Sequence, residues 1–233
     1  MARASFTELV MLLKSPAKAP IQVTNHDGHH IANLQAFGTV SDIPSKWAAD
    51  VAKWRNAHSD RFATQFLANS ENAEKYLQNV ARSDDQILFM ITSLEGERLG
   101  HFGFKRNAEG IVELDNLIRS NSPAPSQLVF YVELTLLQML FTSSTVESVQ
   151  VMVLGSNKAA HGLHRLCGFK KDRKVQVVSK ESNGVVTFEE LSDDKKGDES
   201  FVYLSIDDKT FRQRFSEWLS NRPSEGERSN AIS

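Results

Sequence analysis

The turns in the middle of the chain place the tightest limit on its fold. Three β-leaning apolar runs follow one another closely: residues 86–94, 98–105 and 111–118. Short glycine-bearing turns separate them, Glu95-Gly96-Glu97 and Asn107-Ala108-Glu109-Gly110. Turns this short join antiparallel neighbours, because parallel strands need a crossover of about a dozen residues or more. The sequence therefore predicts an antiparallel meander.

Two passages from strand to helix follow the meander. The first runs from the strand at 111–118 through a proline-containing loop into 127–141, a Leu-rich run without a helix breaker. The second runs from 149–154, an apolar run of strand length, into the helix-like segment 157–167. Gly168 then stands where a glycine that caps a helix C-terminus belongs. The chain thus continues as strand, loop, helix, strand, helix.

The flanking segments complete a single predicted α/β domain. Further strands are expected at 21–24, 31–37, 174–180, 185–191 and 201–206. Further helices are expected at 46–57, after Ser70 and at 209–219. We expect an N-terminal extension over 1–20, the domain over 21–206 with its core over 31–206, a C-terminal helix within 207–222 and a disordered tail over 223–233.

Composition argues against several classes of protein. The 233 residues are 40% hydrophobic and 24% charged, which is typical of a globular chain. Lys and Arg total 27 against 29 for Asp and Glu, and the net charge of −2 leaves no basic excess for a nucleic-acid backbone. No run reaches the roughly 20 apolar residues of a membrane span. The single cysteine, Cys167, excludes an internal disulfide and fits a reducing compartment, so we expect a cytoplasmic location.

One helix carries a recognisable pattern. Residues 157–169 read Asn-Lys-Ala-Ala-His-Gly-Leu-His-Arg-Leu-Cys-Gly-Phe. This resembles the motif Asn-x-x-Ala-x-x-Leu-Tyr-x-x-x-Gly-Phe of the GNAT acyltransferase superfamily, and the spacing from Asn157 through Gly168-Phe169 is kept. An amphipathic helix with a glycine cap also explains the apolar positions, but it explains neither Asn157 nor the order of the strands.

A second resemblance narrows the subgroup. Trp54-Arg55-Asn56 in the first helix, and Glu-Leu-Asp-Asn-Leu-Ile-Arg at 113–119, look like the GNAT enzymes that N-acetylate amino sugars carried on nucleotides. The resemblance implies that Trp54, Arg55 and Asn56 bind the acceptor. A tryptophan on an apolar helix face is also a common core residue, so both interpretations stay open for Trp54.

The resemblance also implies a fold and an acyl donor. The fold is a central mixed, mostly antiparallel sheet with splayed strands, flanked by helices. The donor is acetyl-CoA, which lies between two splayed parallel strands and places its pyrophosphate on free amides at the start of the next helix. The residues implied in this binding are Leu117, Ile118, Arg119, Ser122, Ala124, Ser126, Gln127, Leu128, Asn157 and Ala160.

The loop before that helix departs from the family pattern Gln/Arg-x-x-Gly-x-Gly/Ala. It reads Ser122-Pro123-Ala124-Pro125-Ser126, and its two prolines remove two N–H donors. The small serine and alanine side chains still permit a phosphate to approach, and the serine hydroxyls are additional donors. The alternative is a proline-stiffened loop that only caps a core helix.

Acyl transfer to an amine needs a base, an oxyanion donor and an acid. Strand alternation puts Glu113, Asp115 and Arg119 on one face, and the apolar residues, Leu114 and Ile118 among them, on the other. Glu113 is the first candidate base and Asp115 the second; a structural pair of Asp115 with Arg119 on a solvated face is the alternative.

His164 is the candidate acid. It stands where the family carries the tyrosine that protonates the thiolate of coenzyme A, and an imidazolium is also a competent acid near neutral pH. A structural, hydrogen-bonded histidine is the alternative. The resemblance implies main-chain N–H groups for the oxyanion.

The expected function is direct N-acetylation, in a ternary complex with acetyl-CoA, of an amine on a small polar acceptor such as a nucleotide-linked amino sugar. A protein amino terminus as acceptor, or a non-catalytic module that binds acyl-CoA or a sugar, is the alternative. No metal is expected, because His26, Asp27, His29 and His30 lack metal-ligand spacing and resemble a polar turn. The expected partner is a small molecule, neither nucleic acid nor membrane, and the apolar helix faces fit a homodimer as well as a monomer.

Overall fold

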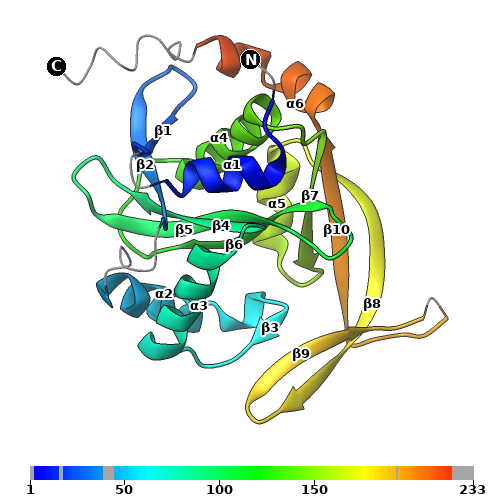
Figure 1. The fold of residues 1–233 in the computed structure, drawn as a ribbon. Coiled ribbons are helices and arrows are strands. Elements are labelled where there is room, and N and C mark those ends of the chain that lie inside the picture. The colour runs from blue at the N-terminus through cyan, green and yellow to red at the C-terminus, as the bar shows by residue number, and fades with distance from the viewer. Residues whose placement is uncertain (1–2, 16–17, 39–44, 193, 222–233) are drawn as a thin grey trace.

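The computed structural model describes residues 3–15, 18–38, 45–192 and 194–221 (Figure 1). The expected tail at 223–233 lies outside the described residues. The described strands form one sheet in the order β1-β2-β4-β5-β6-β7-β10-β8-β9-β3. They are β1 (Ile21–Thr24), β2 (His30–Ala36), β3 (Thr64–Gln65), β4 (Gln86–Thr92), β5 (Arg98–Arg106), β6 (Val112–Arg119), β7 (Ser148–Leu154), β8 (Lys170–Ser182), β9 (Val185–Glu190) and β10 (Glu199–Asp207).

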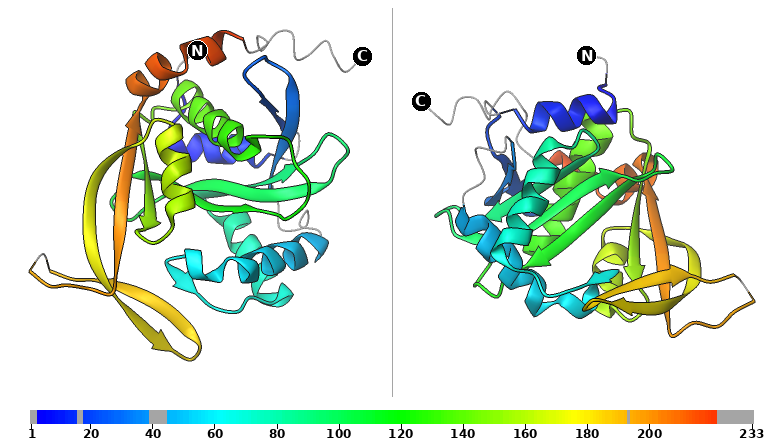
Figure 2. Two further views of the ribbon diagram at one scale, coloured as in Figure 1. Left: turned by 180° about the vertical axis from the view of Figure 1, so that it is seen from behind. Right: turned by 60° about the horizontal axis from the view of Figure 1, so that its bottom comes forward.

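Helices cover both faces of this sheet (Figures 1 and 2). They are α1 (Phe6–Leu13), α2 (Ser45–Ala57), α3 (Ser70–Arg82), α4 (Leu128–Ser143), α5 (Lys158–Leu166), α6 (Asp208–Arg214) and α7 (Ser216–Ser220), with the 3-10 helix η2 (Ser59–Arg61) after α2. One core cluster packs α1, α4 and α6 on one face, with Phe6, Phe141 and Phe211 among its members. A second cluster packs α2 and α3 on the other face, with Trp47 and Leu77 among its members. Among the described helices, none is long and apolar enough to cross a membrane.

The expected α/β fold with a mixed sheet is confirmed. The expectation of one continuous helix at 209–219 is wrong, because the segment is divided into α6 and α7 at Phe215. There φ is −116° and ψ is 24°, outside the helical region. The break accompanies packing of the Phe215 ring on Phe211 at 5.5 Å, and the Trp218 indole N–H donates to the Thr24 main-chain oxygen at 3.3 Å. Tertiary contacts to β1 thus interrupt a locally helical pattern.

The N-terminal helix joins the main core. A capping box starts α1, in which the Ser5 side chain accepts from the N–H of Glu8 and the Glu8 carboxylate accepts from the N–H of Ser5. Leu9 and Val10 are buried in the cluster that also contains α4. This part of the expected N-terminal extension therefore packs on the core of the domain.

The parallel neighbours β6 and β7 touch at a single point. They pair only between Glu113 and Gln150, whereas the other neighbouring strands of the described sheet are antiparallel and pair at two or more positions. Beyond that point β6 continues to Arg119 and β7 to Leu154 without pairing to each other. Strands that part in this way leave main-chain N–H and C=O groups on their facing edges without partners in the ladder.

A β-bulge interrupts β6 beside the splay. Asn116 has φ 56°, in the left-handed region, and the register between β5 and β6 shifts between His101 and Gly103. An inserted residue turns the side chains that follow it to the opposite face. Leu114 accordingly lies in the cluster with α1 and α4, whereas Ile118 lies in the cluster with α2 and α3. The expectation that Ile118 shares a face with Leu114 is wrong, because strict alternation does not survive a bulge.

Candidate functional site

A cavity of about 650 Å³ lies where β6 and β7 part. It is lined by residues 114–121 of β6 and the following loop, by 151–154 of β7, by α5 and its cap, and by 58 and 61–63 after α2. Its volume falls within the range of roughly 300–1,000 Å³ that small-molecule sites occupy. The splay, rather than a gap between domains, thus creates the principal candidate site.

The α5 helix forms one wall of the cavity. Asn157 caps it, since its side-chain oxygen accepts a hydrogen bond from the N–H of Ala160 at 3.1 Å, and both residues line the cavity. At the other end Gly168 has φ 94°, and the N–H of Phe169 donates to the main-chain oxygen of His164 at 3.0 Å. The motif residues therefore fix where α5 begins and ends beside the splay.

His164 lines this cavity and is paired to a buried carboxylate. Its Nδ1 lies 2.8 Å from Oε1 of Glu133 in the middle of α4, and the Glu133 residue is 0% exposed. The other carboxylate oxygen of Glu133 is buried without a hydrogen-bond partner. Phe169 packs edge-on against the imidazole at 5.6 Å. Packing and a charge-assisted hydrogen bond thus hold the ring of His164 in place.

Cys167 lies close to the same carboxylate. It is fully buried, and burial first and the Glu133 charge second raise the pKa of its thiol. A thiol in this environment stays protonated and unreactive. Cys167 is therefore a small buried side chain in this structure.

The α4 helix begins beside the cavity. Its first internal hydrogen bond runs from the N–H of Tyr131 to the oxygen of Gln127 at 3.1 Å. The N–H groups of Val129 and Phe130 precede that bond and have no acceptor within the helix, and Val129 lines the cavity. Gln127 has φ 58°, so a glutamine adopts the left-handed conformation just before the helix.

The expected acetyl-CoA-binding residues divide into two groups. Leu117, Ile118, Arg119, Asn157 and Ala160 line the cavity. Five others are outside its lining, namely Ser122, Ala124, Ser126, Gln127 and Leu128, whereas the preceding loop residues Ser120 and Asn121 are part of it. Ala124 and Leu128 pack against the main core instead. The loop thus approaches the cavity with its first residues.

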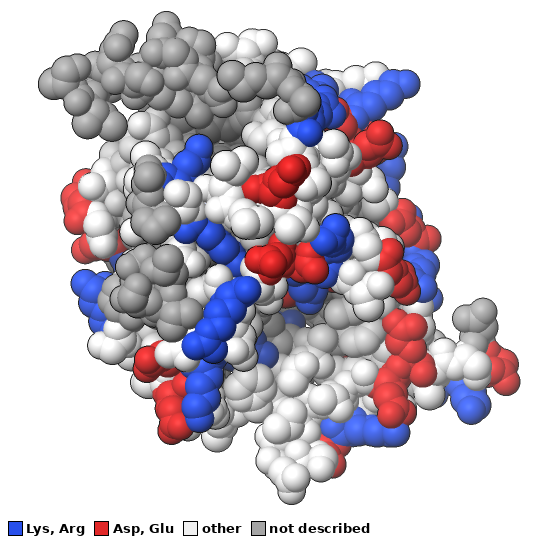
Figure 3. Space-filling model, in the orientation of Figure 1, with Lys and Arg blue, Asp and Glu red and all other residues white. Residues whose placement is uncertain are grey.

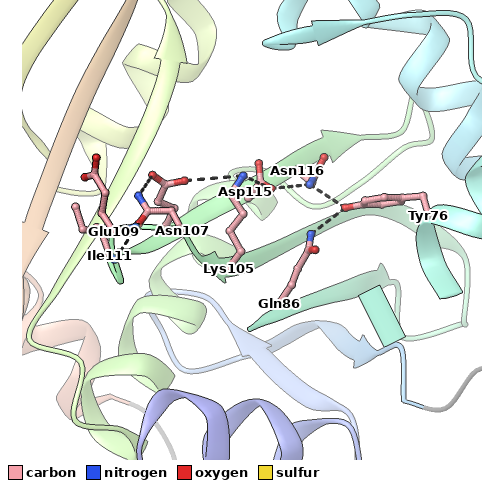
Figure 4. A network of polar contacts seen from close by, with 9 residues as sticks. Tyr76, Gln86, Lys105, Asn107, Glu109, Ile111, Asp115 and Asn116 are labelled. Atoms are coloured by element: carbon pink, nitrogen blue, oxygen red, sulfur yellow. Dashed lines mark hydrogen bonds and ion pairs between the residues drawn. The ribbon is translucent and has the colours of Figure 1, made fainter. Parts of the chain in front are cut away.

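A chain of polar contacts holds the two candidate bases (Figure 4). Lys105 Nζ lies 3.0 Å from the Asp115 carboxylate and 3.9 Å from that of Glu113. Asn107 donates to Glu113, and Asn116 donates to Asp115, each at 2.8 Å. Asp115 lines the cavity, whereas Glu113 lies outside its lining, at the residue where β6 still pairs with β7. Of the two carboxylates, Asp115 is the one that faces the space a substrate would occupy.

Arg55 holds the segment after α2. Its guanidinium lies between the rings of Phe62 and Phe66, 4.4 and 4.5 Å from their centroids. One of its NH₂ groups donates to the main-chain oxygen of Thr64 at 2.8 Å. Arg55 is absent from the lining of the large cavity but helps to line a smaller one of about 90 Å³ on the α2–α3 side of β6, together with His101.

Trp54 and Asn56 also have structural contacts. Trp54 is buried, with its ring 6.1 Å from that of His101. Asn56 exchanges two hydrogen bonds with the main chain of Ala68, at 2.9 and 2.7 Å. Neither residue lines the large cavity. Arg55 and Asn56 thus hold the loop that forms one wall of the site, whereas Trp54 is a core residue.

That loop pairs with the C-terminal hairpin. Thr64 and Gln65 form β3, which pairs with Thr187 and Val186 of β9 at the end of the sheet. The β8–β9 hairpin reaches away from the body of the domain and meets β3 below the splay (Figures 1 and 2). Ala63, next to β3, lines the cavity. The last two strands of the sheet, β9 and β3, therefore pair next to the wall of the cavity that Ala63 forms.

Charge is evenly distributed on the face shown in Figure 3. Blue and red side chains are interspersed across it, without a large area of one sign. Among the described residues, no three His, Cys, Asp or Glu side chains form a group that is able to hold a metal ion.

Sequence reasoning missed Glu133, although a signal existed. It is the only charged residue in the apolar run 127–141, at the centre of what becomes α4. A charge in such a run needs a partner when it is buried. The partner lies 31 residues away on α5, and that pairing depends on how the two helices pack.

Solved structures of low sequence identity share this fold. An uncharacterised protein from Bacillus halodurans aligns with a TM-score of 0.61 and 14% identity over 88% of this chain and 98% of that one. Apo FdhC, a nucleotide-linked sugar GNAT, aligns with a TM-score of 0.60 and 10% identity over 88% of this chain and 100% of that one. RimL, a ribosomal L7/L12 alpha-N-protein acetyltransferase in complex with coenzyme A, aligns with a TM-score of 0.60 and 10% identity over 81% of this chain and 98% of that one.

No protein-family model matches the sequence, and no curated protein matches it either. The likeness therefore lies in the arrangement of strands and helices around the splay. On that likeness, this chain has the fold of the GNAT N-acetyltransferases.

Proposed function

We propose that this protein is an acyl-CoA-dependent N-acyltransferase that moves an acetyl group from acetyl-CoA to an amine of a small polar acceptor. The observation that carries the proposal is the cavity of about 650 Å³ between the diverging strands β6 and β7. The facing edges of β6 and β7 form one wall of this cavity. The start of α4 lies at a second wall, and the motif helix α5, with His164, forms a third.

The features of the cavity fit an acyl-CoA. Beyond the bulge, β6 still pairs with β5, but its edge towards β7 has no ladder partner. The main-chain groups on that edge, at Leu117 to Arg119, line the cavity side and are available to the amide groups of the pantetheine arm. The free amides at Val129 and Phe130 and the positive end of the α4 dipole suit a pyrophosphate without a glycine-rich loop. RimL, which shares the fold, was solved with coenzyme A bound.

The proposed reaction uses Asp115, His164 and main-chain N–H groups of the cavity wall. The acceptor nitrogen attacks the thioester carbon, the N–C bond forms and the C–S bond breaks. Asp115 takes the proton of the amine, directly or through a water, and His164 gives a proton to the departing thiolate. Main-chain N–H groups freed by the splay and the Asn116 bulge stabilise the oxyanion. Glu113 accepts a hydrogen bond from Asn107, lies near Lys105 and is outside the cavity lining, so it has no direct role in the proposed reaction.

The acceptor proposed is an amino sugar carried on a nucleotide. The β3–β9 ladder begins next to Ala63, which lines the cavity, and a barrier beside the site suits a small acceptor better than a folded protein chain. FdhC, a nucleotide-linked sugar GNAT, has the same fold. RimL has it too, and therefore a protein amino terminus is the second candidate acceptor.

The first experiment is thermal unfolding with and without acetyl-CoA. Ligand at about 100 times its Kd stabilises a protein by about 2.7 kcal/mol, which corresponds to a rise in Tm of roughly 5–10 °C for a chain of this length. Ala160→Phe, which fills the cavity from α5, should abolish the shift. Gly162→Ala on the same helix, outside the cavity lining, should keep it.

Thiol release with a panel of amino-sugar nucleotides and peptides then identifies the acceptor. Absence of any thermal shift at millimolar acetyl-CoA would overturn the proposal. A shift without thiol release from any amine would favour the non-catalytic binding module instead.

A further inference from the structure

The pairing of Glu133 with His164 gives the proposed acid a partner. We propose that Glu133 is a positioning residue that fixes the orientation and the tautomer of the His164 ring, so that the two act as one proton-donating dyad towards the thiolate. This inference rests on the proposed function. Glu133 lies on α4, behind the wall of the cavity, and acts through the histidine alone.

The geometry fixes which ring nitrogen faces the chemistry. Nδ1 lies 2.8 Å from the carboxylate oxygen Oε1 of Glu133. A carboxylate only accepts, so Nδ1 carries a proton, and Nε2 is the nitrogen left for the cavity that His164 lines. With a second proton on Nε2 the ring is an acid; without it, Nε2 is a bare acceptor.

Burial makes the two side chains depend on each other. The side chains of His164 and Glu133 are 6% and 0% exposed, so water contributes little to the solvation of either charge. Oε2 of Glu133 is buried without a hydrogen-bond partner. An isolated carboxylate in such a place is costly, and a cation on its partner offsets that cost. Glu133 is therefore the counter-ion for a proton on Nε2 of His164, and Glu133→Gln takes that counter-ion away.

Other charged and titratable groups near the dyad come from three places. His161 lies one turn earlier on α5 and is electrostatically coupled to His164. Cys167 follows α5 and, with its raised pKa, stays neutral beside Glu133. Arg214 of α6 reaches Gly168 and acts on Cys167. Glu133 is the group that makes the hydrogen bond, so it is the one whose removal should change the ring.

The proton transfer balances without a further reactant. As the C–S bond of the thioester breaks, the thiolate takes the Nε2 proton of the imidazolium and leaves as a neutral thiol. The imidazole then stays neutral, with its Nδ1–H on Glu133. Solvent that enters after product release returns the proton to Nε2.

The decisive variant is Glu133→Gln, which keeps the shape and removes the charge. Its kcat should fall roughly 10- to 100-fold at neutral pH, and the alkaline limb of the kcat profile should move to lower pH. Glu147→Gln, which removes an exposed carboxylate, is the matched control and should leave both unchanged. A purely structural Glu133 would lower Tm without moving the limb.

A double-mutant cycle tests whether Glu133 acts through His164. In a His164→Gln background, Glu133→Gln should lower kcat little further. An equal loss in both backgrounds would overturn the inference.

Ring ¹⁵N NMR of histidine-labelled protein gives a readout that needs no turnover. In the wild type, Nδ1 should carry the proton that is bonded to Glu133, and the ¹⁵N signals of the ring should shift in Glu133→Gln. Identical ring signals in the two proteins would overturn the dyad. If the wild type acetylates no amine but these spectra show the dyad, the proposed function fails while the pairing stands.

Discussion

Nδ1 of His101 lies 2.7 Å from the main-chain oxygen of Asn116, so the buried imidazole is joined to the residue that forms the bulge in β6. A carbonyl oxygen only accepts, and the proton of the neutral ring therefore sits on Nδ1. His101 is 1% exposed, and its Nε2 is buried without a partner. The bulge beside the candidate site is thus fixed by an uncharged histidine.

Stability should consequently depend on the protonation of His101. Burial lowers the pKa of His101 from 6.5 to about 4. Between these values the unfolded chain binds a proton that the folded chain does not, so the free energy of unfolding falls as pH falls through this window. A change of this size corresponds to roughly 3 kcal/mol in total.

Urea unfolding at several pH values between 4 and 7 measures this dependence. His101→Asn, which retains a donor for the Asn116 oxygen, should show a shallower loss of stability with acid than the wild type. His29→Asn, at an exposed turn, is the control and should follow the wild type. Equal slopes for the wild type and His101→Asn would contradict the assignment.

The two carboxylates of β6 should differ in their effect on turnover. Asp115→Asn should lower kcat by roughly 100- to 10,000-fold with little change in the KM for acetyl-CoA, because Asp115 lines the cavity. Glu113→Gln, outside the cavity lining, should lower kcat by less than about tenfold. Steady-state thiol release checks both variants. The reverse order of effects would return the role of base to Glu113.

Substitution by alanine should change the free energy of unfolding in opposite directions at Gly103 and Gly162. A Cβ on Gly103 in β5 would lie 2.1 Å from the main-chain oxygen of Ile87, so Gly103→Ala should lower the free energy of unfolding by roughly 1–3 kcal/mol. Gly162 in α5 has nothing within 4 Å of a built Cβ. Gly162→Ala should raise stability by roughly 0.5–1 kcal/mol, because alanine is the better helix former. Chemical denaturation of both variants provides the comparison.

The loop after α2 should loosen when Arg55 loses its flat guanidinium. Arg55→Lys keeps the charge but neither stacks between Phe62 and Phe66 nor reaches Thr64 in the same way. Amide hydrogen exchange at 62–66 should become faster, and stability should fall by about 1 kcal/mol. Lys53→Arg, at an exposed position of α2, is the control and should leave the exchange unchanged. Unchanged exchange in Arg55→Lys would show that the β3–β9 ladder holds the loop by itself.

The sequence by itself determined the order of the central strands and helices, from β4 to α5, and the limits of the motif helix. These depend on local rules: glycine turns between β4, β5 and β6, the Asn157 cap and the Gly168 end of α5. It also placed His164 correctly on the helix that lines the cavity. Each of these inferences concerns residues close together in the chain, where backbone sterics and periodicity act directly.

Only the tertiary structure decided which side chains meet. The bulge at Asn116 turned Ile118 to the other face, because register is set by the partner strand and not by alternation within β6. Asp115 rather than Glu113 lines the cavity, because β6 and β7 part just after Glu113. The Glu133–His164 pair arises from the packing of α4 beside α5, and residue spacing along a chain carries no information about such a distance.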